Sequence, residues 1–392
     1  MHITDVETIP VEIPVKATEE PWGIAPYVGG NRLYDLPTDL TFDEALERVD
    51  TGTTSGRKLL IRLETDDGIT GWGEMKVPSM AVGAAVVEEL LAPELLGRSV
   101  AEPAGFVDAF RTMASTDYLD PRPLLGGVEM AMWDAHGKTL DVPVHQLLGG
   151  KVRDRYPIAF CVGLQRPAEA GEQAAFALEQ GFTTLKTKAS RYWRTDVDRI
   201  VAMDEATDGA LTFRLDPNQQ WDVTQATNVA AALDRAGVRL GYLEQPIRVD
   251  SFGHLAALRA RSAQPIAINE DAYFAHHLLG AIERDAIDAA VVDLVPAGGI
   301  LALTELAAVA ADANVPLAHH SNFDFGIKNA AKLHVLASRR AFSLPMDSVY
   351  YAFEGHLLAE PLTIERGHFV VPDRPGLAGA VDPEQVERYR LD

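Results

Sequence analysis

The sequence predicts an α/β protein in which a (β/α)₈ TIM-type barrel follows a smaller α+β domain. Three observations lead to this expectation. The chain has 392 residues, of which 47% are hydrophobic, enough for a large buried core and more than one small domain needs. From about residue 155 onward, short β-like runs alternate with amphipathic helical stretches. The first 120 residues lack that alternation.

Eight short runs are the candidate barrel strands. Segments with Ala, Leu and Val at helical spacing separate them, so consecutive strands are expected to be parallel. Eight such units match a closed (β/α)₈ barrel, which needs roughly 250 residues. The predicted strands span 156–162, 184–188, 212–216, 241–244, 266–270, 289–294, 316–320 and 341–346.

The N-terminal region predicts two long strands, at 3–15 and 58–64, joined by a Pro- and Gly-rich stretch at 17–56. The second strand turns at 65–68 and continues into Gly-Trp-Gly-Glu, after which a helix is expected at 81–91. A connection as long as 17–56 exceeds the usual loop length, and such loops often serve as lids. We therefore expect an α+β domain that carries a lid.

Composition excludes several classes of partner. The formal net charge of −22 argues against nucleic acid and against an anionic membrane surface. No apolar run approaches the roughly 20 residues that span a bilayer, and the N-terminus does not resemble a signal peptide. Cys161 is the single cysteine, so no intrachain disulfide is possible. We expect a soluble, cytoplasmic protein that forms a homo-oligomer.

The balance of charged residues points to a saline environment. Asp and Glu number 57 against 35 Lys and Arg, and only nine of those 35 are Lys. An acidic, Lys-poor surface suits a protein kept soluble in a high-salt cytoplasm, because salt screens its self-repulsion. The alternative is an ordinary acidic bacterial enzyme.

Polar residues stand at the end of one predicted strand after another. Active sites of such barrels lie at the carboxyl ends of the strands. Steps of 28, 28, 26, 23 and 27 residues separate the marked positions from Lys188 onward, so each step is about one β/α unit. These positions are Lys188 (with Lys186 two residues earlier), Asp216, Glu244, Glu270, Asp293 and His320.

The three acids Asp216, Glu244 and Glu270 predict a metal site. Three carboxylates in one pocket repel one another unless a cation sits among them. Oxygen ligands suit Mg²⁺, with Mn²⁺ as the alternative, and leave positions open for water and substrate. A single strand-end acid more often caps the following helix, but three in adjacent units favour metal binding.

The remaining strand-end residues suggest proton transfer. Lys186 and Lys188 face the same side of a strand, where two lysines are tolerated mainly if they meet anions. We expect Lys188 to act as a base and Lys186 to help neutralise a substrate carboxylate. Asp293 would orient His320 as a second base or acid. As alternatives to these catalytic roles, the two lysines could lie on the surface, and Asp293 could be a helix-capping or core acid.

Together with further motifs, these residues resemble the enolase superfamily, in particular its mandelate racemase subgroup. The resemblance rests on Thr-Asp-Asp-Gly and Gly-Trp-Gly-Glu at 65–74, Gly-Gly-Val-Glu-Met-Ala-Met-Trp-Asp-Ala at 126–135, Gly-Lys at 137–138 and Leu-Leu-Gly-Gly at 147–150. In the barrel it includes the Lys-x-Lys, Asp-x-Asn, Glu-Gln-Pro and Asn-Glu motifs, with Gly-Gly at 298–299 and Pro316 four residues before His320.

The resemblance implies an α+β capping domain at 1–122, a catalytic barrel at 123–360 and a segment at 361–392 that returns to the cap. It implies Mg²⁺ on the three acids, with Lys188 and the His320–Asp293 dyad on opposite sides of the substrate α-carbon. A muconate cycloisomerase would carry Lys in place of Asp293, so that branch is disfavoured. One departure concerns strand eight, where the racemase pattern ends in Glu. Here Asp347, 27 residues after His320, is the candidate substitute.

Several neighbouring residues are expected to contact the substrate or to support the ligands. They are Asn218, Gln245, Asp271 and Asp347 at the strand ends, and Trp22 and Tyr27, with Arg32 and Tyr34, in the lid. The lid aromatics could equally pack the lid against the barrel.

The function expected from all this is Mg²⁺-dependent removal of the proton α to a carboxylate through an enediolate. Dehydration of an acid sugar to a 2-keto-3-deoxy acid comes first. Racemisation or epimerisation of an α-hydroxy acid or related carboxylate is the alternative, followed by a cycloisomerase. A non-catalytic barrel would have lost a strand-end ligand, and none is lost.

Overall fold

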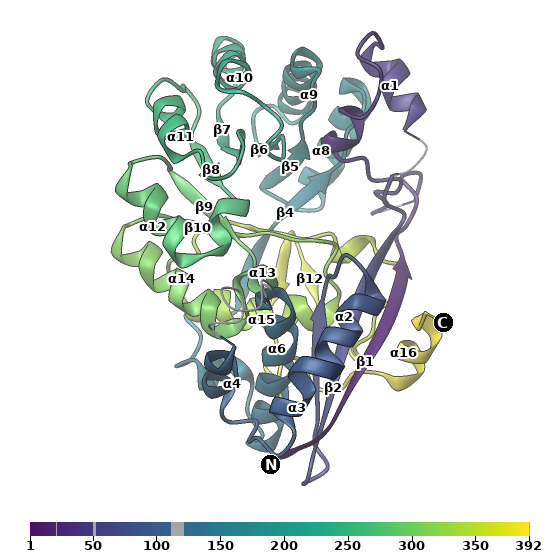
Figure 1. Cartoon of the computed structure of the whole chain (residues 1–392). Coiled ribbons are helices and arrows are strands. Elements are labelled where there is room, and N and C mark those ends of the chain that lie inside the picture. The colour runs from purple at the N-terminus through teal and green to yellow at the C-terminus, as the bar shows by residue number, and fades with distance from the viewer. Residues whose placement is uncertain (21, 50–51, 111–120, 392) are drawn as a thin grey trace.

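The computed structural model describes residues 1–20, 22–49, 52–110 and 121–391. A parallel barrel surrounded by helices packs beside a smaller layer made of a sheet and helices, and both chain ends lie in that smaller layer (Figure 1). The predicted α/β fold, with an N-terminal capping domain and a barrel, is confirmed.

The capping layer is built on an antiparallel sheet in the order β1–β2–β3. β1 and β2 pair along their length, with Val6 opposite Leu63 and Ile9 opposite Leu60. Leu59, Leu60 and Ile61 are fully buried, so the middle of the sheet lies inside the hydrophobic core. The elements are β1 (Ile3–Pro14), β2 (Ser55–Thr65), β3 (Thr70–Met75), α2 (Met80–Val86) with a π turn at Val87–Leu91, α3 (Ala92–Leu95), α4 (Pro103–Ala109) and α6 (Arg122–Thr139).

Two glycines let α6 pack directly on β3. A Cβ at Gly71 would lie 2.2 Å from the carbonyl oxygen of Ala131, and one at Gly73 would lie 1.9 Å from that of Gly127. Any side chain there would push the helix away from the strand. The Gly-Trp-Gly motif is therefore explained by a close backbone approach.

The barrel contains eight parallel strand segments in sequence order. β11 closes the ring by pairing with β4, where Met346 lies opposite Ile158, and a bridge from Leu317 to Phe342 joins β10 to the segment before β11. The strands and the helices around them are β4 (Arg155–Val162), α8 (Pro167–Glu179), β5 (Thr184–Lys188), α9 (Trp193–Ala206), β6 (Thr212–Asp216), α10 (Val223–Arg235), β7 (Leu240–Glu244), α11 (Phe252–Arg259), β8 (Ile266–Ile268), α12 (Ala275–Glu283), β9 (Ala289–Val292), α13 (Leu294–Ala297), α14 (Ile300–Asp312), β10 (Leu317–His319), α15 (Gly326–Ser338) and β11 (Met346–Asp347).

The later strands are shorter than the sequence predicts, and each has a local reason. β8 ends at Ile268, because Asn269 leaves the extended conformation and Glu270–Tyr273 forms a 3₁₀ turn. β9 ends at Val292, because the next residue caps α13. Of the predicted eighth strand, 341–346, only Met346 is regular. It begins β11, which continues to Asp347, and Pro345 before it has no N–H for a ladder.

The segment between β1 and β2 reaches across to the barrel. It is not a plain loop, because it contains a 3₁₀ turn at Gly30–Leu33 and the helix α1 (Phe42–Arg48), which lies close to α8 (Figure 1). Arg166, at the start of α8, forms ion pairs with Asp43 at 2.9 Å and Glu47 at 3.0 Å. The segment thus crosses from the cap to the barrel.

The C-terminal segment returns to the cap. After β12 (Ile364–Glu365) and β13 (His368–Val370), the helix α16 (Pro383–Tyr389) packs near β1, and the amide of Leu391 donates to the carbonyl of Pro10 at 2.9 Å. Asp134 of α6 holds the same segment by accepting from the amide of Leu377 at 2.8 Å.

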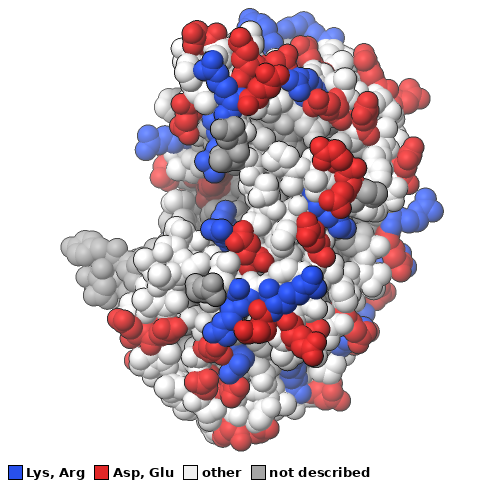
Figure 2. All heavy atoms as spheres, turned by 90° about the vertical axis from the view of Figure 1, so that its right-hand side faces the viewer, with Lys and Arg blue, Asp and Glu red and all other residues white. Residues whose placement is uncertain are grey.

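Acidic side chains are spread over both the upper and the lower part of the face in Figure 2, among fewer basic ones. Among the helices in the described ranges, none combines the length and the apolar character that crossing a bilayer requires.

Candidate active site

The predicted catalytic positions gather at one end of the barrel, because the carboxyl ends of parallel strands share one edge. A cavity of about 880 Å³ opens there between barrel and cap. Of the residues predicted from the sequence, the cavity is lined by Lys186, Lys188, Asn218, Glu270, His320, Asp347, Tyr27 and Arg32. Asp216 and Glu244, the last residues of β6 and β7, are buried directly behind the two lysines.

Lys186 lies at the centre of a cluster of carboxylates. Its Nζ is 2.6 Å from Oε1 of Glu244, 2.8 Å from Oδ2 of Asp347 and 3.2 Å from Oδ2 of Asp216. Burial opposes its charge, but the three acids raise its pKa well above the ordinary value. Lys186 is therefore a permanent cation that balances protein carboxylates. If Lys186 also neutralises a substrate carboxylate, as expected from the sequence, it does so while still paired with these protein carboxylates.

Lys188 is the lysine that faces the cavity. Its Nζ donates to Oδ2 of Asp216 at 2.7 Å and to Oδ1 of Asn218 at 2.8 Å, and 14% of its side chain is exposed. Although burial opposes the charge of Asp216, Lys188 and Lys186 hold the pKa of this carboxyl below its usual range. Asn218 thus positions the predicted base.

Two of the three predicted metal ligands leave an oxygen atom without a partner. Oε2 of Glu244 and Oε2 of Glu270 are buried and accept no hydrogen bond from the described residues. Burial raises the pKa of Glu244 to about 8. The negative charges of Asp216 and Asp347 also raise this pKa, whereas the positive charge of Lys186 lowers it. Buried carboxylate oxygens that lack donors are unfavourable unless a cation binds them. The donor set therefore fits a hard divalent cation such as Mg²⁺.

Asp347 ends β11 where the sequence departs from the racemase pattern. One of its oxygens accepts from Lys186, and the other lies 3.3 Å from Nη1 of Arg214. Burial acts to raise the pKa of Asp347, but the charges of Lys186 and Arg214 outweigh it, so this pKa is lowered. At this strand the cavity is bordered by a carboxylate whose charge is already compensated.

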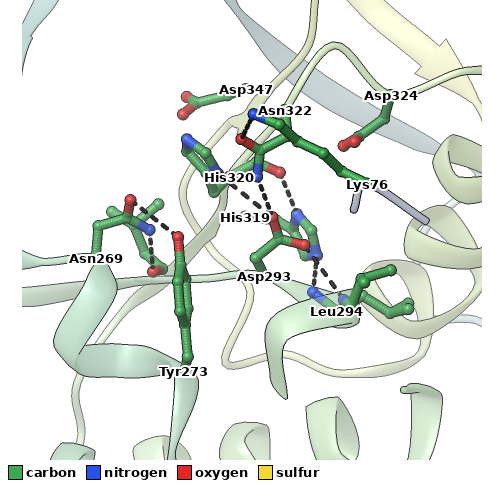
Figure 3. A network of polar contacts seen from close by, with 12 residues as sticks. Lys76, Asn269, Tyr273, Asp293, Leu294, His319, His320, Asn322, Asp324 and Asp347 are labelled. Atoms are coloured by element: carbon green, nitrogen blue, oxygen red, sulfur yellow. Dashed lines mark hydrogen bonds and ion pairs between the residues drawn. The ribbon is translucent and has the colours of Figure 1, made fainter. Parts of the chain in front are cut away.

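Asp293 and His320 form the predicted pair on the other side of the cavity (Figure 3). Nδ1 of His320 lies 3.4 Å from Oδ2 of Asp293. The amide of Asn322 donates to the same oxygen at 3.0 Å, and Nζ of Lys328 lies 2.8 Å from Oδ1. Asp293 also caps α13 by accepting from the amide of Val295 at 3.3 Å. Both interpretations of Asp293, dyad partner and helix cap, describe what this one carboxylate does.

His319 has a structural position. Its Nε2 accepts from the amide of Leu294 at 3.0 Å and its Nδ1 lies 2.6 Å from the carbonyl oxygen of His320 (Figure 3). Burial lowers its pKa to about 3, so it stays neutral. Of the two adjacent histidines, only His320 lines the cavity.

Two of the lid residues expected to contact substrate lie outside the cavity. Trp22 packs on Phe176, Phe182 and Tyr351, with ring centroids 5.3 to 6.0 Å apart. This position is the one expected under the alternative, in which the aromatic packs the lid on the barrel. Tyr34 is likewise absent from the cavity wall.

Gln245 and Asp271 brace the strand ends from behind. Nε2 of Gln245 donates to Asp271 at 2.8 Å, and its Oε1 accepts from the amide of Asn269 at 2.9 Å. Neither side chain lines the cavity. Because these two side chains hydrogen-bond each other and neighbouring backbone, their positions fit support of the adjacent ligands.

A second candidate metal site lies in the described part of the chain. Ligand atoms of Asp250, Asp271 and His277 fall within 4.8 Å of one another. This cluster is outside the main cavity, and Asp271 already accepts from Gln245 and from the amide of Asp250. Glu244 and Glu270 at the strand ends differ, because each has a buried oxygen without a donor among the described residues.

Sequence reasoning missed a set of buried charges between cap and barrel. Asp324 pairs with Lys328 at 2.9 Å and Lys332 at 3.0 Å, and Lys58 lies 3.8 Å away. Glu74 of the cap accepts from the amides of Phe325 and Lys328 at the start of α15. The scarcity of lysine was an available signal, because six of the nine lysines lie in or beside the site: 58, 76, 186, 188, 328 and 332.

Comparisons with known proteins agree with the arrangement. Residues 169–386 match the family model for enolase C-terminal domain-like proteins, and residues 45–149 match that for the mandelate racemase / muconate lactonizing enzyme N-terminal domain. D-galactonate dehydratase of Variovorax paradoxus is 30% identical over 361 residues, covering 87% of this chain and 93% of its own. N-succinyl-L-Arg/Lys racemase of Bacillus cereus is 27% identical over 289 residues, 72% of this chain and 77% of its own.

A solved enolase structure from Streptomyces coelicolor superposes with a TM-score of 0.85 at 28% identity, covering 99% of this chain and 96% of that one. The family matches extend over most of the cap and barrel. The chain belongs to the enolase superfamily, in its mandelate racemase / muconate lactonizing enzyme subgroup, as an enzyme that abstracts the proton α to a carboxylate.

Proposed function

We propose that this enzyme dehydrates an acid sugar to a 2-keto-3-deoxy acid. The observation that carries the proposal is the polar wall of the cavity. Hydroxyl and amide side chains alternate there with the charged groups, as a polyhydroxylated chain requires: Thr53, Ser55, Ser79, Ser321, Asn218, Asn269 and Asn322. Each substrate hydroxyl that enters a dry site needs such a partner. The similarity to a D-galactonate dehydratase supports the same class.

Asp216, Glu244 and Glu270 would hold the divalent cation, which supplies Lewis-acid stabilisation of the negative charge that develops on the substrate carboxylate. Lys188 and His320 are the two groups placed to move protons. β5 and the end of β10 are separated by β4 and β11 on one side of the ring and by β6 to β9 on the other. The two side chains therefore approach a bound substrate from different sides.

The reaction needs one proton removed and one delivered. A base, Lys188 or His320, takes the α-proton, and the electron pair of that C–H bond moves into the enediolate. The pair then forms the α,β double bond as the β-carbon–oxygen bond breaks. His320, as an imidazolium, protonates the departing hydroxyl, which leaves as water. The enol tautomerises to the 2-keto acid.

Racemisation or epimerisation is the second candidate, and one observation favours it. Both proton-transfer groups are present, and a one-sided dehydration needs only one of them to reach the α-carbon. Without loss of a β-hydroxyl, abstraction by one group and return by the other inverts the centre.

The experiment that tests the proposal combines two readouts on a panel of acid sugars and α-hydroxy acids with Mg²⁺. NMR in D₂O follows exchange of the α-proton, and a carbonyl assay follows the 2-keto product. Keto product without epimer supports dehydration. Epimer without keto product assigns the second candidate. If neither substrate class exchanges its α-proton or gives keto product, α-proton abstraction from these acids is wrong.

A further inference from the structure

One lysine in the cavity lacks the carboxylate that its neighbours have. Lys58, Lys186, Lys188, Lys328 and Lys332 each lie within 4 Å of an acid. Lys76 forms no ion pair within the described ranges, and its Nζ makes one long hydrogen bond, 3.4 Å, to Oδ1 of Asn322. The side chain of Lys76 is exposed on the cavity wall, so its charge is open to a ligand rather than neutralised by the protein.

Lys76 is close to the reacting groups. It follows β3 directly, lines the cavity and contacts the side chain of Asn322, whose amide donates to Asp293 (Figure 3). Burial lowers the pKa of Lys76, and Asp324 opposes that effect, while the charges of Lys328 and Lys188 add to it. An anion bound beside Lys76 would offset the cost of desolvating its charge and reduce the repulsion between the lysines.

Arg32 is a second cation without a partner on the cavity wall. Its guanidinium forms no hydrogen bond or ion pair with the other described residues, and it lines the cavity from the 3₁₀ turn at Gly30–Leu33. That turn packs against the end of β5, since a Cβ at Gly30 would lie 1.6 Å from the carbonyl oxygen of Ala189. Arg57, also on the wall, is different, because it pairs with Glu12 at 2.9 Å.

The charges of the metal end are matched once the reacting carboxylate is bound. Asp216, Glu244, Glu270 and Asp347 carry four negative charges, and Lys186, Lys188, Arg214 and a divalent cation would carry five positive ones. The one positive charge left over serves the reacting carboxylate. Lys76 and Arg32 come from the cap side of the cavity and remain unmatched.

We propose that Lys76 binds a second anionic group of the substrate, remote from the reacting carboxylate, and that Arg32, elsewhere on the same cavity wall, adds to the positive charge that attracts it, so that the preferred substrate is a dianion. The shared chemistry is an anionic oxygen group on a polyhydroxylated chain. Its two sources are the far carboxylate of an aldaric diacid and a terminal phosphate on an aldonic acid. This inference rests on the proposed function and names the substrate class of the same site.

The test compares three matched substrates of one configuration in the Mg²⁺-loaded full-length enzyme: a six-carbon diacid, the corresponding monoacid and its 6-phosphate. Galactarate, galactonate and 6-phosphogalactonate form one such set, with the gluco series as a second. The rate of 2-keto product formation gives kcat/KM for each, and NMR follows α-proton exchange in the same samples. We expect the better dianion to exceed the monoacid at least tenfold, because a charge-assisted contact made to the far group of a dianion is worth that much.

Lys76→Met should reduce the dianion-to-monoacid ratio of kcat/KM by about 10- to 100-fold, mainly through KM. Arg32→Gln should reduce it in the same direction. The matched control is Lys151→Met, which removes a lysine paired with Asp154 and Asp373 outside the cavity and should leave all three rates unchanged.

The outcomes separate the two proposals. A diacid preference lost in Lys76→Met identifies carboxylate as the second group, and a preference for the phosphorylated acid lost in the same variant identifies phosphate. Equal rates for monoacid and dianions, or a preference that both variants retain, overturns the subsite while α-proton exchange still supports the proposed function. Absence of both exchange and keto product from every substrate, with Mg²⁺ binding intact, overturns the proposed function, and the subsite with it.

Discussion

Nζ of Lys328 lies 2.8 Å from Oδ1 of Asp293, while Nδ1 of His320 lies 3.4 Å from the other oxygen of the same carboxylate. The shorter contact of Asp293 is therefore with a buried lysine of α15 rather than with the histidine of the dyad. Burial opposes the charge of both partners, yet their attraction holds the pKa of Asp293 below and that of Lys328 above the ordinary value. The acid of the dyad is held in place by the helix that packs against the cap.

Lys328→Met should destabilise the protein strongly. The substitution leaves Asp293 and Asp324 short of one cation in a dry environment, and breaking a buried pair from one side costs about 3–5 kcal/mol. Urea unfolding measures the change in the free energy of unfolding. Lys151→Met is the matched control, since its surface ion pairs should contribute about 1 kcal/mol or less. Equal losses in the two variants would show that the Lys328 contact contributes no more than a surface pair.

Glu244→Gln should weaken Mg²⁺ binding by at least tenfold with little loss of fold. The substitution removes one of three proposed ligands, and even residues that only orient ligands cost about 10–100-fold in metal affinity. Titration calorimetry measures the affinity, and circular dichroism checks the fold. Asp250→Asn is the control for the second cluster of Asp250, Asp271 and His277. If Asp250→Asn abolishes binding and Glu244→Gln does not, the metal site has been placed at the wrong cluster.

Substitution of the two proton-transfer groups should separate the chemistries. For a dehydratase in which Lys188 abstracts, Lys188→Ala should abolish product from one epimer, and His320→Asn should retain slow α-proton exchange with D₂O, because Lys188 remains. A racemase should instead lose turnover in both variants while each keeps exchange from one enantiomer. NMR of each purified epimer gives the answer. Full turnover in either variant would remove that residue from the mechanism.

Stability should rise with ionic strength. The net charge is −22, and added salt shortens the range of repulsion from about 30 Å at 0.01 M to about 3 Å at 1 M. We expect the thermal midpoint to increase between low and molar KCl. EDTA in all samples excludes a contribution from metal binding. A midpoint that stays flat or falls would count against a protein adapted to high salt.

The stability of the fold should decrease as the pH falls below about 6.5, partly through His319. In the unfolded chain this histidine takes up a proton near its ordinary pKa of about 6.5, whereas in the folded protein burial lowers its pKa to about 3. Between these values the unfolded state binds one more proton, so the free energy of unfolding falls by about 1.4 kcal/mol per pH unit from this group.

His319→Asn tests the assignment, because Asn can accept from the amide of Leu294 and donate to the carbonyl of His320 without titrating. The variant should lose about 2 kcal/mol less than the wild type between pH 6.5 and pH 5. Urea unfolding at both pH values measures the difference. Parallel losses in the two proteins would show that His319 is protonated in the folded state.

The sequence by itself determined the barrel and the order of residues around its mouth. The β/α period marks one strand per unit, and parallel strands end at the same edge, so Lys188, Asp216, Glu244, Glu270 and His320 had to meet. The ends of the shorter strands were less predictable, because a residue such as Asn269 leaves the extended conformation for local reasons that the hydrophobic pattern does not record.

The tertiary structure alone decided which charges neutralise one another and which side chains reach the cavity. Lys328 contacts Asp293 from the start of α15, which Glu74 holds against the cap. Trp22 lies outside the cavity because its ring packs in an aromatic cluster. Such contacts join segments tens to hundreds of residues apart, and their geometry follows from how helices pack on sheets. A periodic pattern records which face of an element is buried, but it does not record which partner that face meets.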